Sequence, residues 1–320
     1  MSAPRRQRVL DAMAAAGLDA VVLGREANAR YVSGARRLWL AGARAFAPSC
    51  VLTSGGDVHL LSASDDGVPA DIPFAHLYPI TWNPSKLTAR LATIPGLARA
   101  HTIGVDALTP TMSTLLSLTF PSADLADAQA LLLAARRVKS AEEVDTMRAA
   151  VAIAAAALDD VIAAAVPGAR ECDLLGRFAQ QACERGTTTP AFEGRFGSVF
   201  PSDRALVAGE RVVFDVGVLV DGYEGGLART IVCGDGGGVV APADAAFEEV
   251  LARVGPGVPC ADVARFADGV GLGAEPLSVA GGDDVLVEGM TLSVRVEVEE
   301  WVRRDQVLVT ARGAELLLGP

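Results

Sequence analysis

The sequence predicts an α/β protein with two domains. The chain has 320 residues, of which 51% are apolar and 21% are charged, a balance typical of globular proteins with a sizeable core. Near the N-terminus, residues 5–17 carry apolar side chains at helical spacing, and the apolar run from Ala20 to Leu23 follows at once. A helix that leads directly into a buried strand is the usual beginning of an α/β domain.

Short apolar runs further along predict the rest of the first domain. Residues 50–53 and 58–61 predict two strands, because the turn-forming sequence Ser-Gly-Gly-Asp at 54–57 separates them. Residues 102–106 predict another strand. Residues 121–131 then lead out of this domain.

The second domain opens with a well-marked helix start. Ser140 is a good helix cap, and Glu142 and Glu143 lie in the first turn, where the helix dipole favours acidic side chains. The Ala-rich stretch beyond them predicts a long helix, and residues 172–183 predict a second one. We place the boundary near residue 135, so that the domains comprise residues 1–135 and 136–320.

Charge and cysteine usage limit the possible partners and the compartment. A formal charge of −11 and a pI near 4.8 argue against nucleic acid or an anionic membrane surface as a partner, because both would repel the chain. The five cysteines lack CxxC spacing, which indicates reduced thiols in a cytoplasm. The most apolar helix candidate, residues 151–166, is too short to span a bilayer. We expect a soluble, cytoplasmic protein that binds a small molecule or a peptide-like ligand.

Several motifs point to one family. The chain reads NARYVSG at 28–34, KSAEEVDTM at 139–147 and DVGVLVDGYEGGLART at 215–230, with EGMTLSV at 288–294 and RRDQVLVTARGAELL at 303–317. Together these resemble motifs of the creatinase, aminopeptidase P and prolidase (M24) family. The resemblance covers nearly the whole chain. It implies a creatinase-type N-terminal α/β domain followed by a pita-bread domain, here shortened in its second half, and a homodimer would suit the family.

The resemblance also implies that most metal ligands are missing. In active relatives two aspartates, one histidine and two glutamates hold two divalent ions, which activate the attacking water. Asp215 falls on the first aspartate and Gly226 on the second, Asp268 on the histidine, and Arg295 and Arg304 on the glutamates. Since only one ligand of five is retained, we expect no divalent metal and no metallopeptidase activity.

The histidine count supports this expectation without an alignment. The three histidines, His59, His76 and His101, all precede residue 136, so the second domain has none. Metal-free creatinase relies on a catalytic histidine whose approximate position here is Ser198. A further family histidine falls on Glu275.

The replacements are consistent in charge. The formal charges of two aspartates, Asp215 and Asp268, and two arginines, Arg295 and Arg304, sum to zero. The charges of four carboxylates and two divalent ions also sum to zero. We therefore hypothesise that guanidinium groups take the place of metal, in bidentate pairs with carboxylates. Alternatively, Asp215 is a relic that bonds backbone amides or an arginine, and Arg295 and Arg304 are ordinary surface charges. Secondary candidates for the pocket are Ser198, Tyr223, Glu224, Arg229, Glu275 and Glu297, although we expect Arg229 to hold the hairpin rather than to touch a ligand.

Three functions remain open at this stage. The first is a metal-free protein that binds a small anionic ligand or a partner in the former active-site cleft. The second is a metal-independent hydrolase of a small amide or amidine, with Asp215 or Glu275 as general base. The third is an Xaa-Pro peptidase that keeps metal through other ligands.

Overall fold

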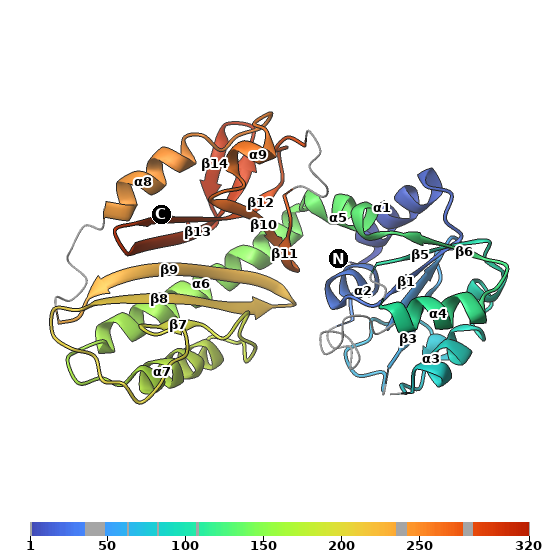
Figure 1. The fold of residues 1–320 in the computed structure, drawn as a ribbon, viewed down its shortest axis with the longest axis horizontal. Coiled ribbons are helices and arrows are strands. Elements are labelled where there is room, and N and C mark those ends of the chain that lie inside the picture. The colour runs from blue at the N-terminus through green and yellow to red at the C-terminus, as the bar shows by residue number, and fades with distance from the viewer. Residues whose placement is uncertain are drawn as a thin grey trace. The chain divides into compact units, whose positions relative to one another are not determined.

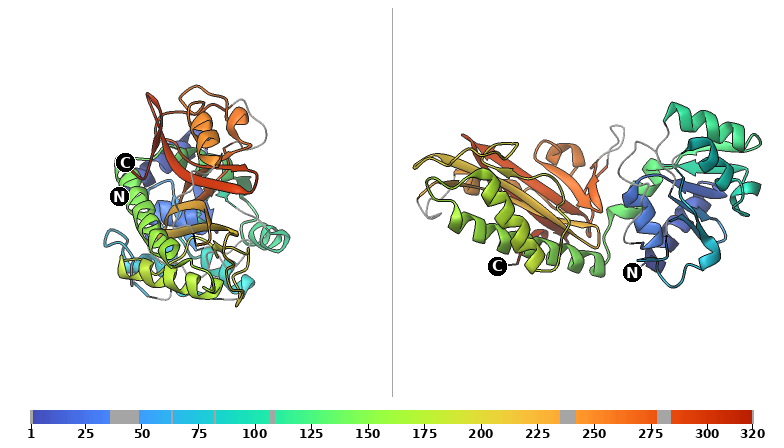
Figure 2. Two further views of the ribbon diagram at one scale, coloured as in Figure 1. Left: turned by 90° about the vertical axis from the view of Figure 1, so that its left-hand side faces the viewer. Right: turned by 90° about the horizontal axis from the view of Figure 1, so that it is seen from below.

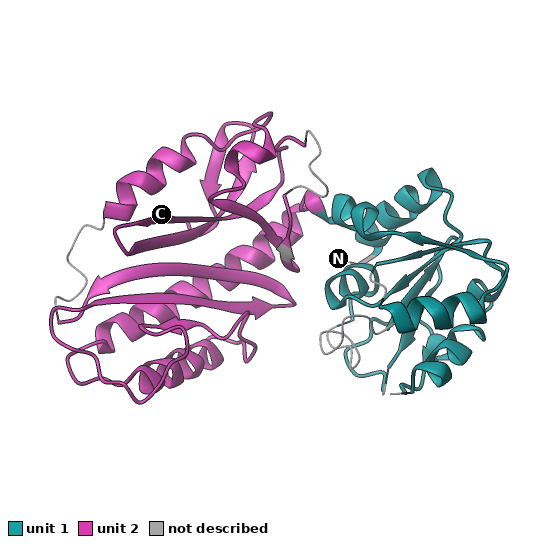
Figure 3. Cartoon of the chain, viewed as in Figure 1, with its two compact units in different colours: residues 1–136 teal, residues 137–320 magenta. Residues whose placement is uncertain are grey.

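The computed structural model describes residues 2–35, 49–62, 64–81, 83–106, 109–234, 242–277 and 284–319. The chain divides into two compact units, Met1–Arg136 and Arg137–Pro320 (Figure 3). The clustered glycines at 234–238 predict a turn, but beyond Gly234 this segment lies outside the described residues. Within the described ranges, no helix combines the length and apolar character that crossing a bilayer requires.

The first unit is an α/β domain built on a six-stranded mixed sheet (Figure 1). All four side chains of the strand Ala20–Leu23 are buried, so both faces of the sheet are covered. This strand pairs antiparallel with Cys50–Thr53 and parallel with Thr102–Val105. The sheet order is β4-β3-β2-β1-β5-β6. The main elements are α1 (Ser2–Ala15), β1 (Ala20–Leu23), α2 (Glu26–Ser33), β2 (Cys50–Thr53), β3 (Val58–Leu61), β4 (Leu77–Tyr78), α3 (Pro84–Leu91), β5 (Thr102–Val105), α4 (Pro110–Thr119), β6 (Asp124–Asp127) and α5 (Gln129–Arg137).

The NARYVSG motif has a structural role in this unit. It forms most of α2, and Gly34 ends the helix with a φ of 74°, which glycine adopts readily. The buried amide of Asn28 donates to Asp106 Oδ2 over 3.0 Å, and the backbone N–H groups of Gly24 and Arg25 also donate to this carboxylate. Burial raises the pKa of Asp106, and these donors partly offset the rise. The motif therefore fastens α2 to the end of β5.

The second unit is an antiparallel sheet with helices packed against it. Figure 2 shows α6 and α7 against one face of β8 and β9. The strand order is β11-β10-β12-β13-β9-β8-β7, and β14 pairs with β13. The elements are α6 (Ala141–Ala164), α7 (Glu171–Glu184), β7 (Arg195–Phe196), β8 (Arg211–Val220), β9 (Tyr223–Val232), α8 (Pro242–Leu251), α9 (Cys260–Val263), β10 (Ala267–Gly271), β11 (Gly273–Glu275), β12 (Thr291–Val298), β13 (Trp301–Thr310) and β14 (Gly313–Leu316).

The two halves of this unit differ in size. The helices α6 and α7 have 24 and 14 residues, whereas α8 and α9 have ten and four. The second half still has its own apolar core, in which α8 and α9 pack on β12 and β13. Helices therefore cover one face of the sheet in both halves of the unit.

Glu143 fastens the long helix to the central hairpin. The predicted cap of α6 is present as a capping box, in which Ser140 Oγ accepts the Glu143 N–H and Glu143 Oε2 accepts the Ser140 N–H. The other carboxylate oxygen of Glu143 accepts the hydroxyl of Tyr223 over 2.6 Å. Tyr223 is only 1% exposed and is absent from the cleft described below. It is therefore a packing residue, and sequence reasoning misplaced it among the pocket candidates.

Candidate functional site

Strand alternation places charged side chains on the sheet face opposite the helices. Val216 of β8 and Val294 of β12 point into the two apolar cores. Their neighbours Asp215 and Arg295 point the other way, because successive side chains of a strand alternate between faces. There they border an open cleft of about 430 Å³. Its lining residues are Phe192, Asp215, Glu224, Ala264, Arg265, Phe266, Ala267, Asp268, Ser293, Arg295 and Arg304.

Two arginines share the carboxylate of Asp215. Arg304 donates from Nε and Nη2 to Asp215 Oδ1 over 3.0 and 2.6 Å. Arg295 donates from Nη1 to the other oxygen, Oδ2, over 2.8 Å. The side chains of Asp215 and Arg304 are 19% and 9% exposed, whereas Arg295 is 40% exposed. Arg304 is therefore the main counter-charge, since water screens Arg295.

Gly226 makes room for the Arg304 guanidinium. In the β8–β9 hairpin Gly226 lies opposite Gly217. A Cβ atom at position 226 would lie 2.9 Å from Arg304 Nη2 and 3.0 Å from Nη1. The same Nη2 also donates to the carbonyl of Val216 over 3.1 Å. Beside the position where the resemblance places a second aspartate, the structure therefore has an arginine that donates to Asp215 and to the Val216 carbonyl.

The second carboxylate at Arg304 is Glu224 rather than Asp268. Glu224 Oε1 lies 3.6 Å from Arg304 Nη1, and Glu224 is largely buried. Burial raises the pKa of Glu224, Arg304 lowers it, and Asp215 raises it further. Asp268 lies on β10 beside Ser293 of β12, exposed at the cleft, and no cation of the described residues forms an ion pair with it. The charge balance expected between Asp268 and the arginines was therefore assigned to the wrong acid.

Glu297 plays a minor part. Its Oε2 lies 3.4 Å from Arg295 Nη2, and its side chain is 57% exposed. An exposed pair of this kind contributes little to stability.

Six of the lining residues were not among the sequence candidates, and two of these, Phe192 and Arg265, have side chains that shape or charge the cleft. The Phe192 ring stacks near Arg304, whose Cζ lies 5.1 Å from the ring centroid. It fits there because Gly217 has no side chain, since a Cβ atom would lie 2.7 Å from Phe192 Cε1. Arg265 also lines the cleft, and among the described residues it has no carboxylate partner. No motif marks either position, and the only clue to Arg265 is its place three residues before Asp268.

Three other candidates lie outside this cleft. Ser198 donates its hydroxyl to Glu171 Oε1 over 2.8 Å. Arg229 binds Asp305 Oδ1 over 2.7 Å and the Arg304 carbonyl over 3.0 Å, so it holds strand β9 to strand β13 rather than closing the β8–β9 hairpin. Glu275 forms a buried ion pair with Lys139. The second hypothesis named Glu275 as a possible general base, but this carboxylate neutralises a buried lysine away from the cleft.

The donor set does not fit the divalent ion pair that the resemblance implies. Across the described ranges, no three His, Cys, Asp or Glu side chains converge in a way that could hold a metal. Both oxygens of Asp215 face guanidinium groups, and a cation at this place would be repelled by them. The chemistry of this cleft is therefore that of arginines and carboxylates.

Comparisons with known proteins agree with the fold and the motifs. Residues 5–138 match the creatinase/prolidase N-terminal domain, and residues 145–270 match the metallopeptidase family M24. A probable dipeptidase PepE of Mycobacterium tuberculosis, and its counterpart in Mycobacterium bovis, are each 32% identical over an alignment of 222 residues, with 56% of this chain covered. The chain spans 58% of the length of these curated relatives.

Solved structures show the same fold over nearly the whole chain. The prolidase from Pyrococcus furiosus has a TM-score of 0.76 at 18% identity, with 98% of this chain and 99% of that chain covered. The X-Pro aminopeptidase from Thermotoga maritima has a TM-score of 0.79 at 16% identity, with 98% and 97% covered. The dipeptidase PepE from Mycobacterium ulcerans has a TM-score of 0.70 at 24% identity, with 100% and 96% covered.

At these identities the structures establish the fold alone, while the sequence matches establish descent. A creatinase/prolidase-type N-terminal domain is followed by a domain of the metallopeptidase family M24 with the pita-bread fold, and together they have the fold of solved prolidases and X-Pro aminopeptidases.

Proposed function

We propose that this chain is a metal-free M24 protein without metallopeptidase activity, which binds a small anionic, peptide-like ligand in the cleft of its pita-bread domain. The observation that carries the proposal is the position of the Arg304 guanidinium between Asp215 and the Cα of Gly226. The Arg304 guanidinium and its hydrogen-bond partners Asp215, the Val216 carbonyl and Ser293 Oγ fill the place where a metal would need anionic oxygens.

The free charges of the cleft favour a ligand with both an anionic and a cationic end. Arg295 uses one nitrogen on Asp215 and is 40% exposed, and Arg265 has no carboxylate partner among the described residues. Both can donate to a ligand carboxylate. Asp268 offers an exposed carboxylate in the same cleft, which suits a ligand amine. A short peptide or an amino acid derivative carries both groups.

The metal-free state has a direct test. Protein purified with added Mn²⁺ or Co²⁺ should contain only substoichiometric metal, because Asp215 is the one family ligand retained at the five positions and it is already paired with two arginines. The same samples should not hydrolyse alanyl-proline. Elemental analysis and a ninhydrin assay measure the two outcomes. Stoichiometric metal that disappears in Asp215→Ala would reject the proposal and restore a metallopeptidase.

Ligand binding is tested with alanyl-proline as the probe. Calorimetric titration should give a saturable signal, and Arg265→Ala should weaken binding roughly ten- to hundred-fold, because a hydrogen bond to a charged group contributes about 1.5–3 kcal/mol. Arg253→Ala is the matched control, since Arg253 is also exposed but does not line the cleft. Equal affinity in both variants would show that the cleft is not the binding site.

A second candidate function is favoured by one observation. Glu224 lies in the cleft with a raised pKa, which suits a carboxylate that takes part in proton transfer. A hydrolase of a small amide or amidine could use it as general base. Turnover of such a substrate, lost in Glu224→Gln and retained in Glu297→Gln, would support the hydrolase over the binding protein.

A further inference from the structure

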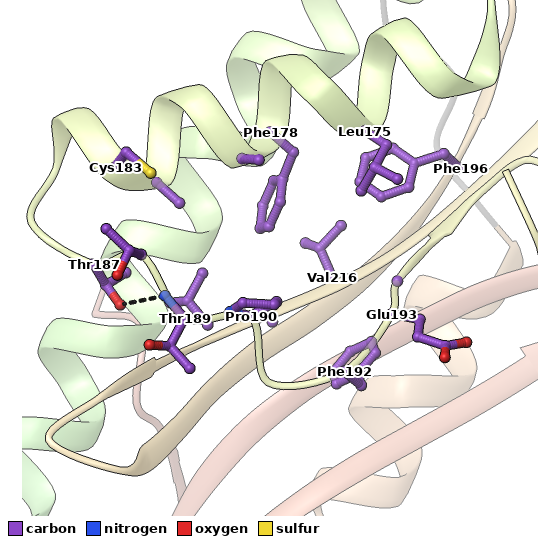
Figure 4. Close-up of a pocket in the computed structure, with 16 residues that line it drawn as sticks. Leu175, Phe178, Cys183, Thr187, Thr189, Pro190, Phe192, Glu193, Phe196 and Val216 are labelled. Atoms are coloured by element: carbon purple, nitrogen blue, oxygen red, sulfur yellow. Dashed lines mark hydrogen bonds between the residues drawn. The ribbon is translucent and has the colours of Figure 1, made fainter. Parts of the chain in front are cut away.

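A second hollow lies in the pita-bread domain between α7 and the edge of β8 (Figure 4). Its volume is about 150 Å³. Its floor consists of buried side chains, and its mouth consists of exposed residues. The floor is formed by Phe178, Ala182, Phe196, Val216 and Val218. The mouth is formed by Ala179, Cys183, Thr188, Thr189 and Pro190.

The interior offers apolar surface and no charge. The Thr187 hydroxyl donates to the Leu219 carbonyl over 2.6 Å and accepts the Thr189 N–H, so its polar atom is already used. Glu193 is the one charged residue in the lining, and its carboxylate points away from Phe178 (Figure 4). A bound group would therefore meet carbon atoms on nearly every side.

Backbone hydrogen bonds hold the hollow open. Ala191 donates its N–H to the Gly217 carbonyl over 2.9 Å, and Leu219 donates to the Thr189 carbonyl over 2.9 Å. The segment that forms one wall is thereby fixed along β8 and cannot collapse onto α7. On the floor, the Phe196 ring packs edge-on against Phe178, with centroids 5.9 Å apart. The cavity is thus preformed.

Protein interiors are close-packed, and voids much larger than a water molecule are few. An apolar cavity of about 150 Å³ disfavours water, which would find no hydrogen-bond partners, and accepts guests of the size of benzene. We propose that this hollow is a binding site for a small, uncharged, monocyclic aromatic molecule, which enters between Cys183 and Pro190 and packs on Phe178 and Val216.

This site is separate from the proposed function of the cleft. Arg265, Arg295 and Arg304 do not line it, and Phe192 is the single residue that borders both hollows in the described structure. The proposal for the apolar hollow can therefore be tested independently of the proposal for the cleft.

Toluene serves as the probe in full-length protein. Saturable binding is expected in ligand-observed NMR, together with a Tm that rises with toluene concentration, because a ligand that binds the folded state stabilises it. Ala182→Leu should abolish both effects by filling the floor. Gln180→Leu is the matched control, since Gln180 is exposed on the same helix and does not line the hollow. Arg265→Ala should bind toluene as the parent protein does.

A second variant and a second measurement distinguish a filled cavity from a folding defect in Ala182→Leu. Ala179→Phe adds a ring at the exposed mouth, where the fold tolerates it, and should also prevent binding. In a Cys172→Ala background Cys183 is the accessible thiol, because Cys50, Cys233 and Cys260 are buried. Toluene should slow its alkylation by a maleimide. Absence of saturable binding, or binding that persists in both filled variants, would overturn the proposal.

Discussion

Replacing Arg304 by methionine is expected to destabilise the protein by about 3–5 kcal/mol, the usual cost of removing one partner from a buried ion pair. Methionine fills similar space but leaves Asp215 without its main counter-charge and Glu224 without any within 4 Å in the described structure. Chemical denaturation at neutral pH measures the loss. Arg295→Met is the control, and it should cost only about 0–1 kcal/mol, because that side chain is 40% exposed.

The Arg304→Met variant should also regain stability in acid. Burial raises the pKa of Glu224, and the arginine that lowers it is gone in this variant. A folded-state pKa above the unfolded value means that the folded protein binds more protons between the two values, so stability falls as the pH rises through that window. Lowering the pH from neutrality towards the raised pKa should therefore recover part of the loss. If the loss of stability relative to the parent protein does not change with pH, the protonation of Glu224 does not depend on Arg304.

Gly225→Ala is expected to cost about 3 kcal/mol or more, at the upper end of overpacking effects. A Cβ atom at this position would lie 2.2 Å from both the carbonyl carbon of Ala150 and the amide nitrogen of Val151. Both atoms belong to the backbone of α6, so no side chain can turn aside to relieve the clash. The helix would have to move off strand β9.

The control for this prediction is Gly176→Ala. Gly176 lies inside α7, where an added Cβ meets nothing within 4 Å. Alanine is the better helix former by about 0.5–1 kcal/mol, so this variant should be slightly more stable. Thermal denaturation of the two variants should move Tm in opposite directions. Equal and small shifts would mean that β9 and α6 are less tightly apposed than their backbone positions indicate.

Local patterns in the sequence predict much of the fold. The strands at 20–23, 50–53 and 58–61 are present with the expected bounds, because their apolar runs end at turn-forming residues. The start of α6 is also confirmed, since its capping box lies within four residues. The strand Asp124–Asp127 was missed. It is an edge strand of four residues with acidic ends, so it has no apolar run to mark it.

The cleft depends on contacts that no local pattern contains. Family motifs brought Asp215, Arg295 and Arg304 into consideration, and strand register brings them together across 80 and 89 residues. Glu224 was undervalued, since a glutamate in a strand is usually exposed and its burial is visible only in three dimensions. Phe192 and Arg265 come from segments outside any strand, whose path the sequence does not specify.

The contact between Arg304 and Gly226 constrains how this cleft can evolve. Aspartate at position 226 would require the Arg304 guanidinium to shift, because this group lies 2.9 Å from where the Cβ would be placed. If Arg304 were lost first, the carboxylates of Asp215 and Glu224 would lack this counter-charge in a poorly hydrated place. Each single step towards a two-aspartate hairpin therefore disturbs the ion pairs of Arg304 with Asp215 and Glu224. Positions 226 and 304 are therefore coupled, and a change at one is best accommodated by a matching change at the other.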